Sequence, residues 1–387
     1  MESNISNYFT RLFFYKKSLW LVLIIIGLIA KFALFPVETG DYIHFFKPWI
    51  QFIETHGYAS SLKYNFYNYP PSYIYILIGI AKTGLNPLFF IKIISVTFEF
   101  LAAFFIGKIA FLKYKDNLVI WTSIAIIPLL PTVLLNSSYL SQCDSIYASF
   151  VLGSVYFLLK NKHLYSVLFL AFAFVFKVQS VFILPLFFVV MLKGKIQWYY
   201  FLIIPVFFLL SLIPAASFGR PFTNLLSTYY SQANQYRFLT DQFPNLYIWI
   251  DNQYYEIVKL LGIIVTCSVT IITGIILSQK KYRFNSEMWI QLALISAIVI
   301  PFILPGMHER YMYIGDILSV LYFIVFRKNI YVPIGIVSVS LYSYIRCSRF
   351  NDILPMEPAF FIYLSVIIFL IVNFIQVLKK STDDTKL

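Results

Sequence analysis

Charged residues are scarce in this chain of 387 residues. Asp, Glu, Lys and Arg together make up 12% of it, whereas apolar residues make up 60%. A soluble globular domain is about a quarter charged and about half apolar. The shortage of charge, together with a mean hydropathy of +0.78, argues against a soluble domain and favours a chain that lies largely within a membrane.

Cysteine and histidine are rare as well. The three cysteines lack CxxC spacing, and the four histidines are dispersed between positions 44 and 308. A structural zinc ion needs four such ligands at close spacing along the chain or in the fold. We therefore expect no zinc site.

Long apolar stretches are abundant. Segments of about 20 mainly apolar residues recur along the whole length, and each could cross the hydrocarbon core of a bilayer. We therefore predict an all-α polytopic membrane protein with a bundle of about 12 transmembrane helices. The expected helices cover about 18–36, 88–107, 117–135, 145–160, 164–178, 180–192, 197–214, 257–278, 287–304, 312–326, 329–345 and 358–378.

Basic residues follow the apolar segments in a regular way. The net charge of +13 comes from small clusters in alternate turns rather than from one long patch, which argues against a nucleic-acid partner. Basic turns of polytopic proteins face the cytoplasm. Both termini are then expected to be cytoplasmic, together with the turns that carry Lys108, Lys113 and Lys115, Lys160 and Lys162, Lys193 and Lys195, Lys280, Lys281 and Arg283, Arg327 and Lys328, and Lys379 and Lys380.

The short apolar segment Tyr73–Ala81 determines which side of the membrane the later turns face. Lys82 and Gly84 follow it, and if it spanned the membrane, the later basic turns would face outward. We interpret it as an interfacial or re-entrant helix, because its tyrosines favour the membrane–water boundary. Two long external loops with interfacial helices result, at about 37–87 and 215–256.

The threading places the residues capable of chemistry near the external boundary, where charged groups commonly mark a site. Asp41 could accept a proton, with Glu38 as the alternative base. The structural alternatives are capping for Asp41 and Asp144, snorkelling for Lys177, and a carbonyl contact for His308. A phosphate or pyrophosphate would suit the cations Lys177, Arg220, Arg237, His308 and Arg310.

One carboxylate is expected at membrane depth. Glu99 lies in the second predicted helix, where an unpaired charge would be expensive. Lys92 lies seven residues earlier on the same helix. We therefore expect a structural interaction between Lys92 and Glu99.

The order of these residues resembles the GT-C superfamily of integral membrane glycosyltransferases. The likeness is closest to bacterial members that use polyprenyl-phosphate sugars, and it extends to the endoplasmic-reticulum enzymes that use dolichyl-phosphate glucose or mannose. It covers about 41–316, with a departure at Leu140-Ser141, where relatives often have Trp-Gly. The motifs that carry it are Asp41 shortly after the first helix, Tyr69-Pro70-Pro71, Gln142-x-Asp144, Lys177-x-Gln179 and His308-Glu309-Arg310.

The resemblance implies a GT-C-like bundle that transfers one hexose from a polyprenyl-phosphate donor to an acceptor hydroxyl, with inversion. The acceptor would be a cell-surface or lipid-linked glycan, such as O-antigen or teichoic acid, on the external face of a bacterial inner or plasma membrane. The general base would be Asp41. The donor phosphate would contact His308, Arg310, Lys177 and Arg220, and the substrates would also contact Gln142, Asp144, Gln179, Tyr69 and Glu309.

The resemblance also implies how the chain is organised. Residues 1–256 would form the catalytic transmembrane module, and the helices of 257–387 would complete the donor site. No cofactor is expected. Glu38 and Asp41 could share a divalent metal ion, but the cations already suit the donor phosphate, so we favour a metal-free site.

Two other classes stay open. A flippase or transporter for lipid-linked sugars tends to place polar residues near the midplane, often in repeated halves, and neither feature is visible in the sequence. A polysaccharide polymerase would share the external loops and basic residues but would use a pyrophosphate-linked oligosaccharide. The choice of donor separates the three classes.

Overall fold

The computed structural model describes residues 17–349 and 354–383, which fold into a bundle of α-helices. The all-α class that the sequence predicts is confirmed. The bundle helices are α2 (Lys17–Leu34), α5 (Pro87–Tyr114), α6 (Leu118–Ile126), α7 (Pro131–Leu134), α8 (Asp144–Leu159), α9 (His163–Phe176), α10 (Leu184–Leu192), α11 (Ile203–Ser217), α14 (Tyr255–Ser278), α15 (Ser286–Ile303), α16 (Tyr313–Phe326), α17 (Tyr331–Arg349) and α18 (Glu357–Asp383).

Shorter elements occupy the two long loops and the helix ends. The loop helices are α3 (Lys47–Thr55), α4 (Pro71–Lys82), α12 (Phe222–Leu226) and α13 (Thr228–Gln235). Strands β1 (Thr240–Asp241) and β2 (Met307–His308) pair in parallel. Tight 3-10 or π turns are η1 (Tyr42–Phe46), η2 (Tyr58–Lys63), η3 (Ile127–Leu129), η4 (Leu135–Tyr139), η5 (Val178–Ile183), η6 (Trp198–Leu202), η7 (Asn252–Tyr254) and η8 (Glu309–Met312).

Within the described residues, fewer helices than the expected 12 are long and apolar enough to span a membrane. Among the described residues, 5 helical segments are long and apolar enough to cross a membrane, and a bent pair would make up to 6. The structure thus supports a multi-pass membrane protein, whereas the expected 12 spans are not confirmed. The 5 segments are Pro87–Tyr114, Trp198–Ser217, Asn252–Ser278, Ser286–Ile303 and Glu357–Ser381, and the shorter apolar helices are Ser18–Leu34, Asp144–Leu159, His163–Phe176 and Val178–Leu192.

The bent pair corrects one expected helix. We predicted a single helix at about 117–135, but Leu118–Leu129 and Pro131–Tyr139 meet at an angle of 60°. A proline pushes the preceding residue out of the α conformation. Leu130 accordingly has an extended backbone (φ −57°, ψ 131°) immediately before Pro131.

Helix α8 lies at the centre of the bundle and packs against α5 and α9. Small residues let neighbouring membrane helices approach closely. At Gly107 of α5, an added Cβ would lie 2.6 Å from the Cα atom of Ile120 in α6. At Gly153 of α8, an added Cβ would collide with the ring of Phe169 in α9. These contacts let α5 pack closely on α6, and α8 on α9.

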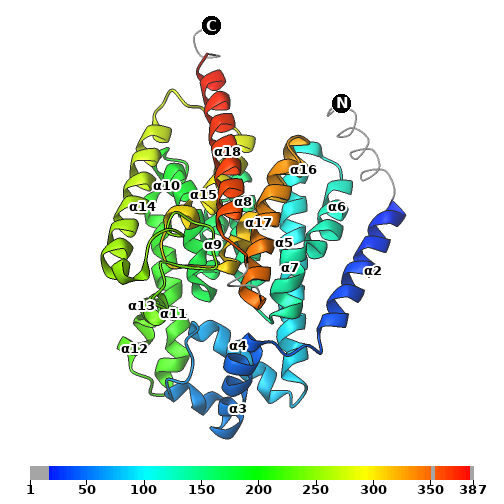
Figure 1. Ribbon diagram of the computed structural model, residues 1–387, viewed down its shortest axis with the longest axis vertical. Helices are drawn as coiled ribbons and strands as arrows, with labels where there is room; N and C mark the ends of the chain where they lie inside the picture. Colours follow the sequence, from blue (N-terminus) through cyan, green and yellow to red (C-terminus); the bar gives the residue numbers. More distant parts are fainter. Residues whose placement is uncertain (1–16, 350–353, 384–387) are drawn as a thin grey trace.

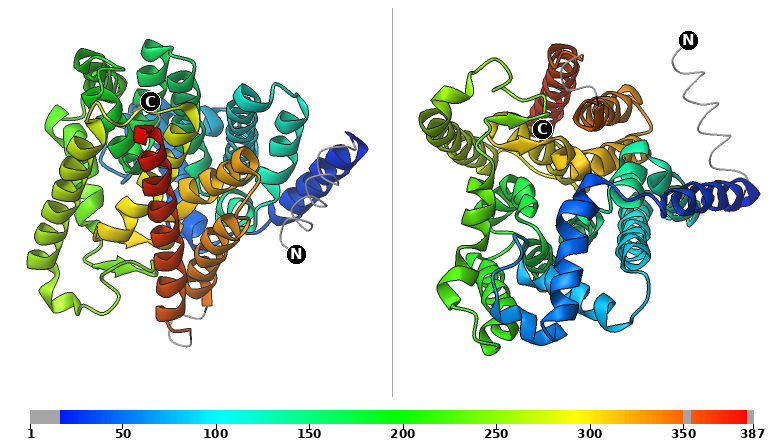
Figure 2. Two further views of the ribbon diagram at one scale, coloured as in Figure 1. Left: turned by 90° about the horizontal axis from the view of Figure 1, so that it is seen from above. Right: turned by 60° about the horizontal axis from the view of Figure 1, so that its bottom comes forward.

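The two ends of the bundle carry different elements, with the loop helices at one end and basic turns at the other. Helices α3 and α4 of the first loop and α12 of the second lie at one end, whereas α2 begins and α18 ends toward the opposite one (Figures 1 and 2). Basic turns contact one another at that opposite end. Lys113 donates to the carbonyl oxygen of Val325 (2.7 Å) and pairs with Glu287 (2.8 Å), while Lys193 donates to the carbonyl oxygen of Tyr282 (2.7 Å). The expected alternation of loops and basic turns is therefore consistent with the fold.

The expected Lys92–Glu99 interaction is wrong. Glu99 pairs instead with Lys31 of α2, at 2.6 Å between Nζ and Oε2, and both side chains are almost fully buried. Seven residues of helix correspond to about 10.5 Å of rise, which is too far for a direct contact. The ammonium of Lys92 donates to the carbonyl oxygens of Leu34, Phe35 and Val37, at 2.9, 3.1 and 2.8 Å, where α2 ends and leaves carbonyl groups without helical partners.

The orientation in the membrane remains a prediction that labelling can test. In a cysteine-free background, Glu54→Cys should react with an impermeant thiol reagent on intact cells, and Lys281→Cys should react only after permeabilisation. Both positions are exposed. Glu54 lies in α3 of the first long loop, and Lys281 lies in the basic turn between α14 and α15. Labelling of Lys281→Cys but not of Glu54→Cys on intact cells would reverse the threading.

Removal of one partner of the Lys31–Glu99 pair should destabilise the bundle, because the remaining charge is buried without compensation. We expect Lys31→Met to lower the free energy of unfolding by about 3–5 kcal/mol. Denaturation in detergent micelles measures the loss. The matched control is Lys31→Met/Glu99→Gln, which removes both charges and should recover most of it. Losses that simply add in the double variant would show that the two side chains are not coupled.

Candidate functional site

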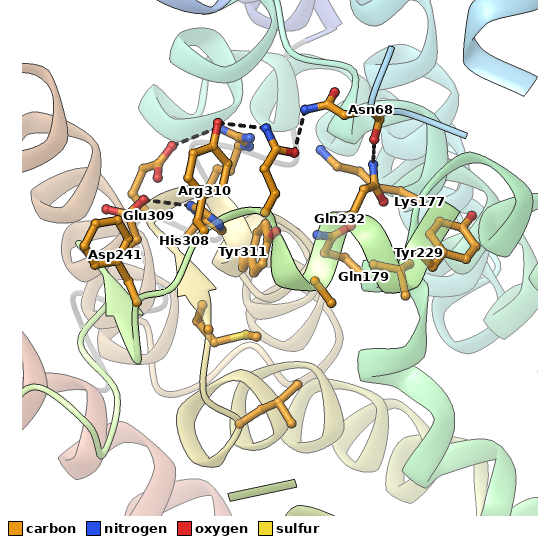
Figure 3. Close-up of a pocket in the computed structure, with 18 of the residues that line it drawn as sticks. Asn68, Lys177, Gln179, Tyr229, Gln232, Asp241, His308, Glu309, Arg310 and Tyr311 are labelled. Atoms are coloured by element: carbon orange, nitrogen blue, oxygen red, sulfur yellow. Dashed lines mark hydrogen bonds and ion pairs between the residues drawn. The ribbon is translucent and has the colours of Figure 1, made fainter. Parts of the chain in front are cut away.

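A cavity of about 440 Å³ lies where the two long loops meet the ends of the bundle helices (Figure 3). Its walls come from segments that are far apart in the sequence. They include Asp41, Phe45, Asn68, Tyr69, Gln142, Lys177, Gln179, Tyr229, Gln232, Gln235, Tyr236, Asp241, Lys259, His308, Glu309, Arg310 and Tyr311. Among the residues predicted for the site, Asp144, Arg220, Arg237 and Glu38 do not line this cavity, and the others do.

Asp41 is oriented by its neighbours. It directly precedes the π turn η1, and its Oδ2 atom accepts a hydrogen bond from Nε2 of Gln142 (2.5 Å) and lies 3.7 Å from Nη1 of Arg310. The hydroxyl of Tyr69 donates to Oε1 of Gln142 (3.0 Å), which fixes the amide. Among the described contacts, only Oδ2 of Asp41 is engaged, so the other carboxylate oxygen is available to a ligand.

Tyr69 is itself held in place by its sequence neighbours. Pro71 begins helix α4, and Pro70, which precedes it, has an extended backbone (ψ 144°). The Tyr69 ring lies 5.5 Å from the rings of Trp49 and Tyr73. This aromatic packing directs the phenol toward Gln142.

Lys177 reaches the cavity because the helix breaks at its position. Its extended backbone (φ −157°, ψ 133°) separates α9 from η5. The ammonium pairs with Oδ1 of Asp144, and Oδ2 of Asp144 accepts from Asn136 (2.8 Å), which also donates to the hydroxyl of Tyr344 (2.9 Å). Asp144 therefore positions Lys177 from behind the cavity wall, and it does not cap α8, whose first residue it is.

His308, Glu309 and Arg310 come from β2 and η8. The pairing of β1 with β2 sets Asp241 beside His308, and Nδ1 of His308 lies 2.9 Å from Oδ2 of Asp241. Hydrogen bonding from His308 lowers the pKa of Asp241 below its usual value although partial burial opposes this. Arg310 pairs with Glu309 (3.1 Å), while its buried Nε atom has no hydrogen-bond partner among the described residues. Arg310 thus retains a donor for a ligand.

Gln179 also presents a group without a protein partner. It lies two residues after Lys177 in η5, only 5% of it is exposed, and its Oε1 atom has no hydrogen-bond partner among the described residues. A buried polar atom that is left unpaired carries an energetic penalty. A ligand hydroxyl in the cavity could remove this penalty.

Several wall residues were not predicted. Asn68 donates to Oε1 of Gln235 (2.7 Å), and Gln232 donates to the carbonyl oxygen of Asn68 (2.5 Å). Tyr229, Gln232 and Tyr236 follow one another at spacings of three and four residues, which is the repeat of one helix face. This spacing in the segment of α13 is the signal that could have identified this wall. Asp241 carried no comparable signal.

Three other predicted residues lie elsewhere. Nη2 of Arg220 donates to Oδ1 of Asn65 (2.5 Å), and the guanidinium lies 4.3 Å from the ring centre of Tyr67, so Arg220 holds the two loops together outside the cavity. Arg237 forms an exposed ion pair with Glu256. The alternative base, Glu38, pairs with Lys47 (3.0 Å) on the surface and does not line the cavity.

One group of side chains in the cavity has the composition of a metal site. Single ligand atoms of Asp241, His308 and Glu309 all lie within 4.8 Å of one another. However, His308 pairs with Asp241 and Glu309 pairs with Arg310, so these side chains already satisfy one another's charge. The expectation of a metal-free site stays a prediction.

Comparison with known proteins does not assign the chain. No family model matches the sequence, and a search of curated proteins found no significant match. What the fold and the cavity define is a class: an all-α membrane protein with a polar, partly aromatic cavity at its loop-bearing end.

The Asp241–His308 contact should hold the second loop against the cavity. We expect Asp241→Asn to make limited proteolysis of residues 236–254 roughly fivefold faster, because loss of one partly exposed charge pair is worth about 1 kcal/mol. The pKa of Asp241 is lowered in the fold, so its contribution is present above the unfolded value and is lost only as pH falls through the folded value, below 3.8.

The matched control for this loop is Glu256→Gln, which removes an exposed ion pair with Arg237 from the same segment. Exposed pairs contribute little, so cleavage of this variant should proceed as in the wild type. Equal cleavage rates for Asp241→Asn and the wild type at neutral pH would show that the loop is held by its other contacts, such as the hydrogen bonds of Asn245 and Tyr247.

Proposed function

We propose that this chain is a membrane glycosyltransferase that transfers one hexose from a polyprenyl-phosphate-linked sugar to an acceptor hydroxyl. The reaction would take place on the periplasmic or extracellular face of the plasma membrane, with both termini in the cytoplasm. The observation that carries the proposal is that a carboxylate, Asp41, and the cations Lys177, His308 and Arg310 line one cavity.

Asp41 is the proposed general base. Its Oδ2 atom is held by Gln142 and Arg310, and its other oxygen takes the proton of the acceptor hydroxyl. The hydroxyl oxygen forms a bond to the anomeric carbon on the face opposite the lipid phosphate. The bond from that carbon to the phosphate oxygen breaks with its electron pair, which inverts the configuration of the sugar.

The cations stabilise the leaving lipid phosphate, which gains negative charge as its bond to the sugar breaks. Each has a carboxylate partner in the described structure: Asp144 for Lys177, Asp241 for His308 and Glu309 for Arg310. Such partners reduce the desolvation penalty of the cations while the site is empty. The unpartnered Nε of Arg310 supplies a further donor to the phosphate.

The remaining walls suit a sugar and a lipid. Gln179 and Gln232 offer amides to ring hydroxyls, and aromatic side chains such as Tyr229 and Tyr236 offer faces for stacking. On the bundle side the cavity is lined by apolar residues, where the first isoprene units of a donor would lie. These residues are Val178, Val181, Phe182, Ile263, Leu304 and Pro305.

A transporter for lipid-linked sugars is the second candidate. Lys31, Glu99 and Asp316 are fully buried within helices, and ionisable residues inside membrane helices often mark transport pathways. These three do not line the cavity, which favours the enzyme. A polymerase remains distinguishable because it would need a pyrophosphate-linked oligosaccharide.

Substitution of the proposed base tests the enzyme directly. Asp41→Asn keeps the shape of the side chain but cannot take a proton, so turnover should fall about 10²–10⁴-fold while donor binding persists. The measurement is sugar transfer from synthetic polyprenyl-phosphate donors by the purified protein. Glu38→Gln is the matched control, because this exposed carboxylate pairs with Lys47 outside the cavity, and it should keep most of the activity.

Two outcomes would count against the proposal. Turnover of Asp41→Asn at the wild-type rate would remove Asp41 from the role of base. Failure of the wild type to transfer sugar from any polyprenyl-phosphate donor, combined with movement of a lipid-linked sugar across vesicles, would favour the transporter.

A further inference from the structure

A second cavity, of about 410 Å³, lies at the end of the bundle that carries the basic turns. It forms where the end of α10, the end of α14 and the start of α15 come together. Its lining residues are Leu192, Lys193, Lys195, Ser278, Lys280, Tyr282, Phe284 and Trp289. Three lysines and three aromatic residues therefore surround a pocket that the proposed activity does not use.

The charge of this pocket is uncompensated. No Asp or Glu lines it, and no salt bridge joins Lys193, Lys195 or Lys280 to a carboxylate within the described residues. The acid in the first turn of α15, Glu287, pairs with Lys113 instead (2.8 Å). The cavity at the other end differs, because there Lys177, His308 and Arg310 each have a carboxylate partner.

The lysines are placed by the way α10 ends. Gly194 adopts a left-handed backbone (φ +68°), and the amides of Gly194 and Lys195 donate to the carbonyl oxygens of Met191 (2.8 Å) and Val190 (3.1 Å). These two hydrogen bonds and the left-handed glycine form a Schellman motif, which ends the helix. It places Lys193 and Lys195 on either side of the turn.

Aromatic rings and backbone carbonyls hold these side chains in the pocket. Lys193 donates to the carbonyl oxygen of Tyr282 (2.7 Å) and lies 4.8 Å from the ring centre of Phe284. Lys195 lies 5.9 Å from the ring centre of Trp289. Burial lowers the pKa of Lys193 and of Lys195, and an anion in the pocket would oppose that effect. The cations are thus partly desolvated and lack a counter-charge.

The surroundings of the pocket indicate the rest of the ligand. The outer face of α14 exposes apolar side chains next to it, with Ile272 58% exposed and Ile275 55% exposed. Leu192, which lines the pocket, is 40% exposed. A free inorganic anion would use only the lysines. A phospholipid would place its phosphate among the lysines and its acyl chains along α14.

We propose that Lys193, Lys195 and Lys280 bind the phosphate of an anionic phospholipid headgroup at this end of the bundle. Basic pockets between membrane helices are suited to such headgroups. The lipid would bridge α10, α14 and the start of α15, which already pack against one another and are linked by the Lys193 side chain. This site does not depend on the proposed glycosyltransferase activity.

The test measures lipid binding to the purified, delipidated full chain by native mass spectrometry. Dioleoylphosphatidylglycerol is the anionic probe, dioleoylphosphatidylcholine is the zwitterionic probe, and millimolar inorganic phosphate is the competitor. We expect binding of the anionic lipid in preference to the zwitterionic one, without displacement by phosphate. Lys195→Gln/Lys280→Gln should weaken this binding roughly twenty-five-fold, because each of the two lysines contributes about a fivefold gain.

The matched control is Lys328→Gln/Lys380→Gln, which removes the same charge from exposed positions outside the pocket. It should bind the anionic lipid as the wild type does, and the charge-preserving Lys195→Arg/Lys280→Arg should also bind. Binding by Lys195→Gln/Lys280→Gln at the wild-type level would overturn the proposal. So would equal binding of both lipids, or displacement by inorganic phosphate.

Discussion

A charge that leaves water needs an opposite charge or hydrogen-bond partners, and this requirement organises the polar end of the bundle. Lys177 with Asp144, His308 with Asp241 and Arg310 with Glu309 join α8, η5, the second loop and η8. The Lys177–Asp144 pair links the end of α9 to the start of α8, the His308–Asp241 pair adds to the pairing of β2 with β1, and the Arg310–Glu309 pair lies within η8. These pairs help to hold the walls of the cavity together, and their carboxylates reduce the repulsion between the basic side chains that line it.

The sequence predicts the elements of this structure better than their contacts. Apolar length and basic turns locate most helices to within a few residues, because both signals are local. Residues 41, 142, 177 and 308–310 could be expected at one end of the bundle for the same reason, and they meet there. The bend before Pro131 is also a local signal, yet its consequence for the number of spans depends on the angle between two helices.

Contacts between distant segments could not be predicted. Lys31 is Glu99's partner because α2 lies against the bundle beside α6 and η4, and nothing in the spacing of α5 indicates this. Arg220 carries the charge that suits a phosphate, but packing of Tyr67 and Asn65 withdraws it from the cavity. The polar face of α13 was overlooked because its few residues carry amides and phenols rather than charge.

The short pairing of β1 with β2 joins the second loop to the segment that carries His308. A ligand that contacts His308 also affects Asp241, which contacts His308, and therefore the part of the second loop that lines the cavity. Binding and loop closure are then linked equilibria: a ligand that prefers the closed loop must raise the free energy of opening it by the same amount that closure adds to its affinity. The increase in protection of the loop backbone from exchange when the cavity is occupied would therefore measure this coupling free energy.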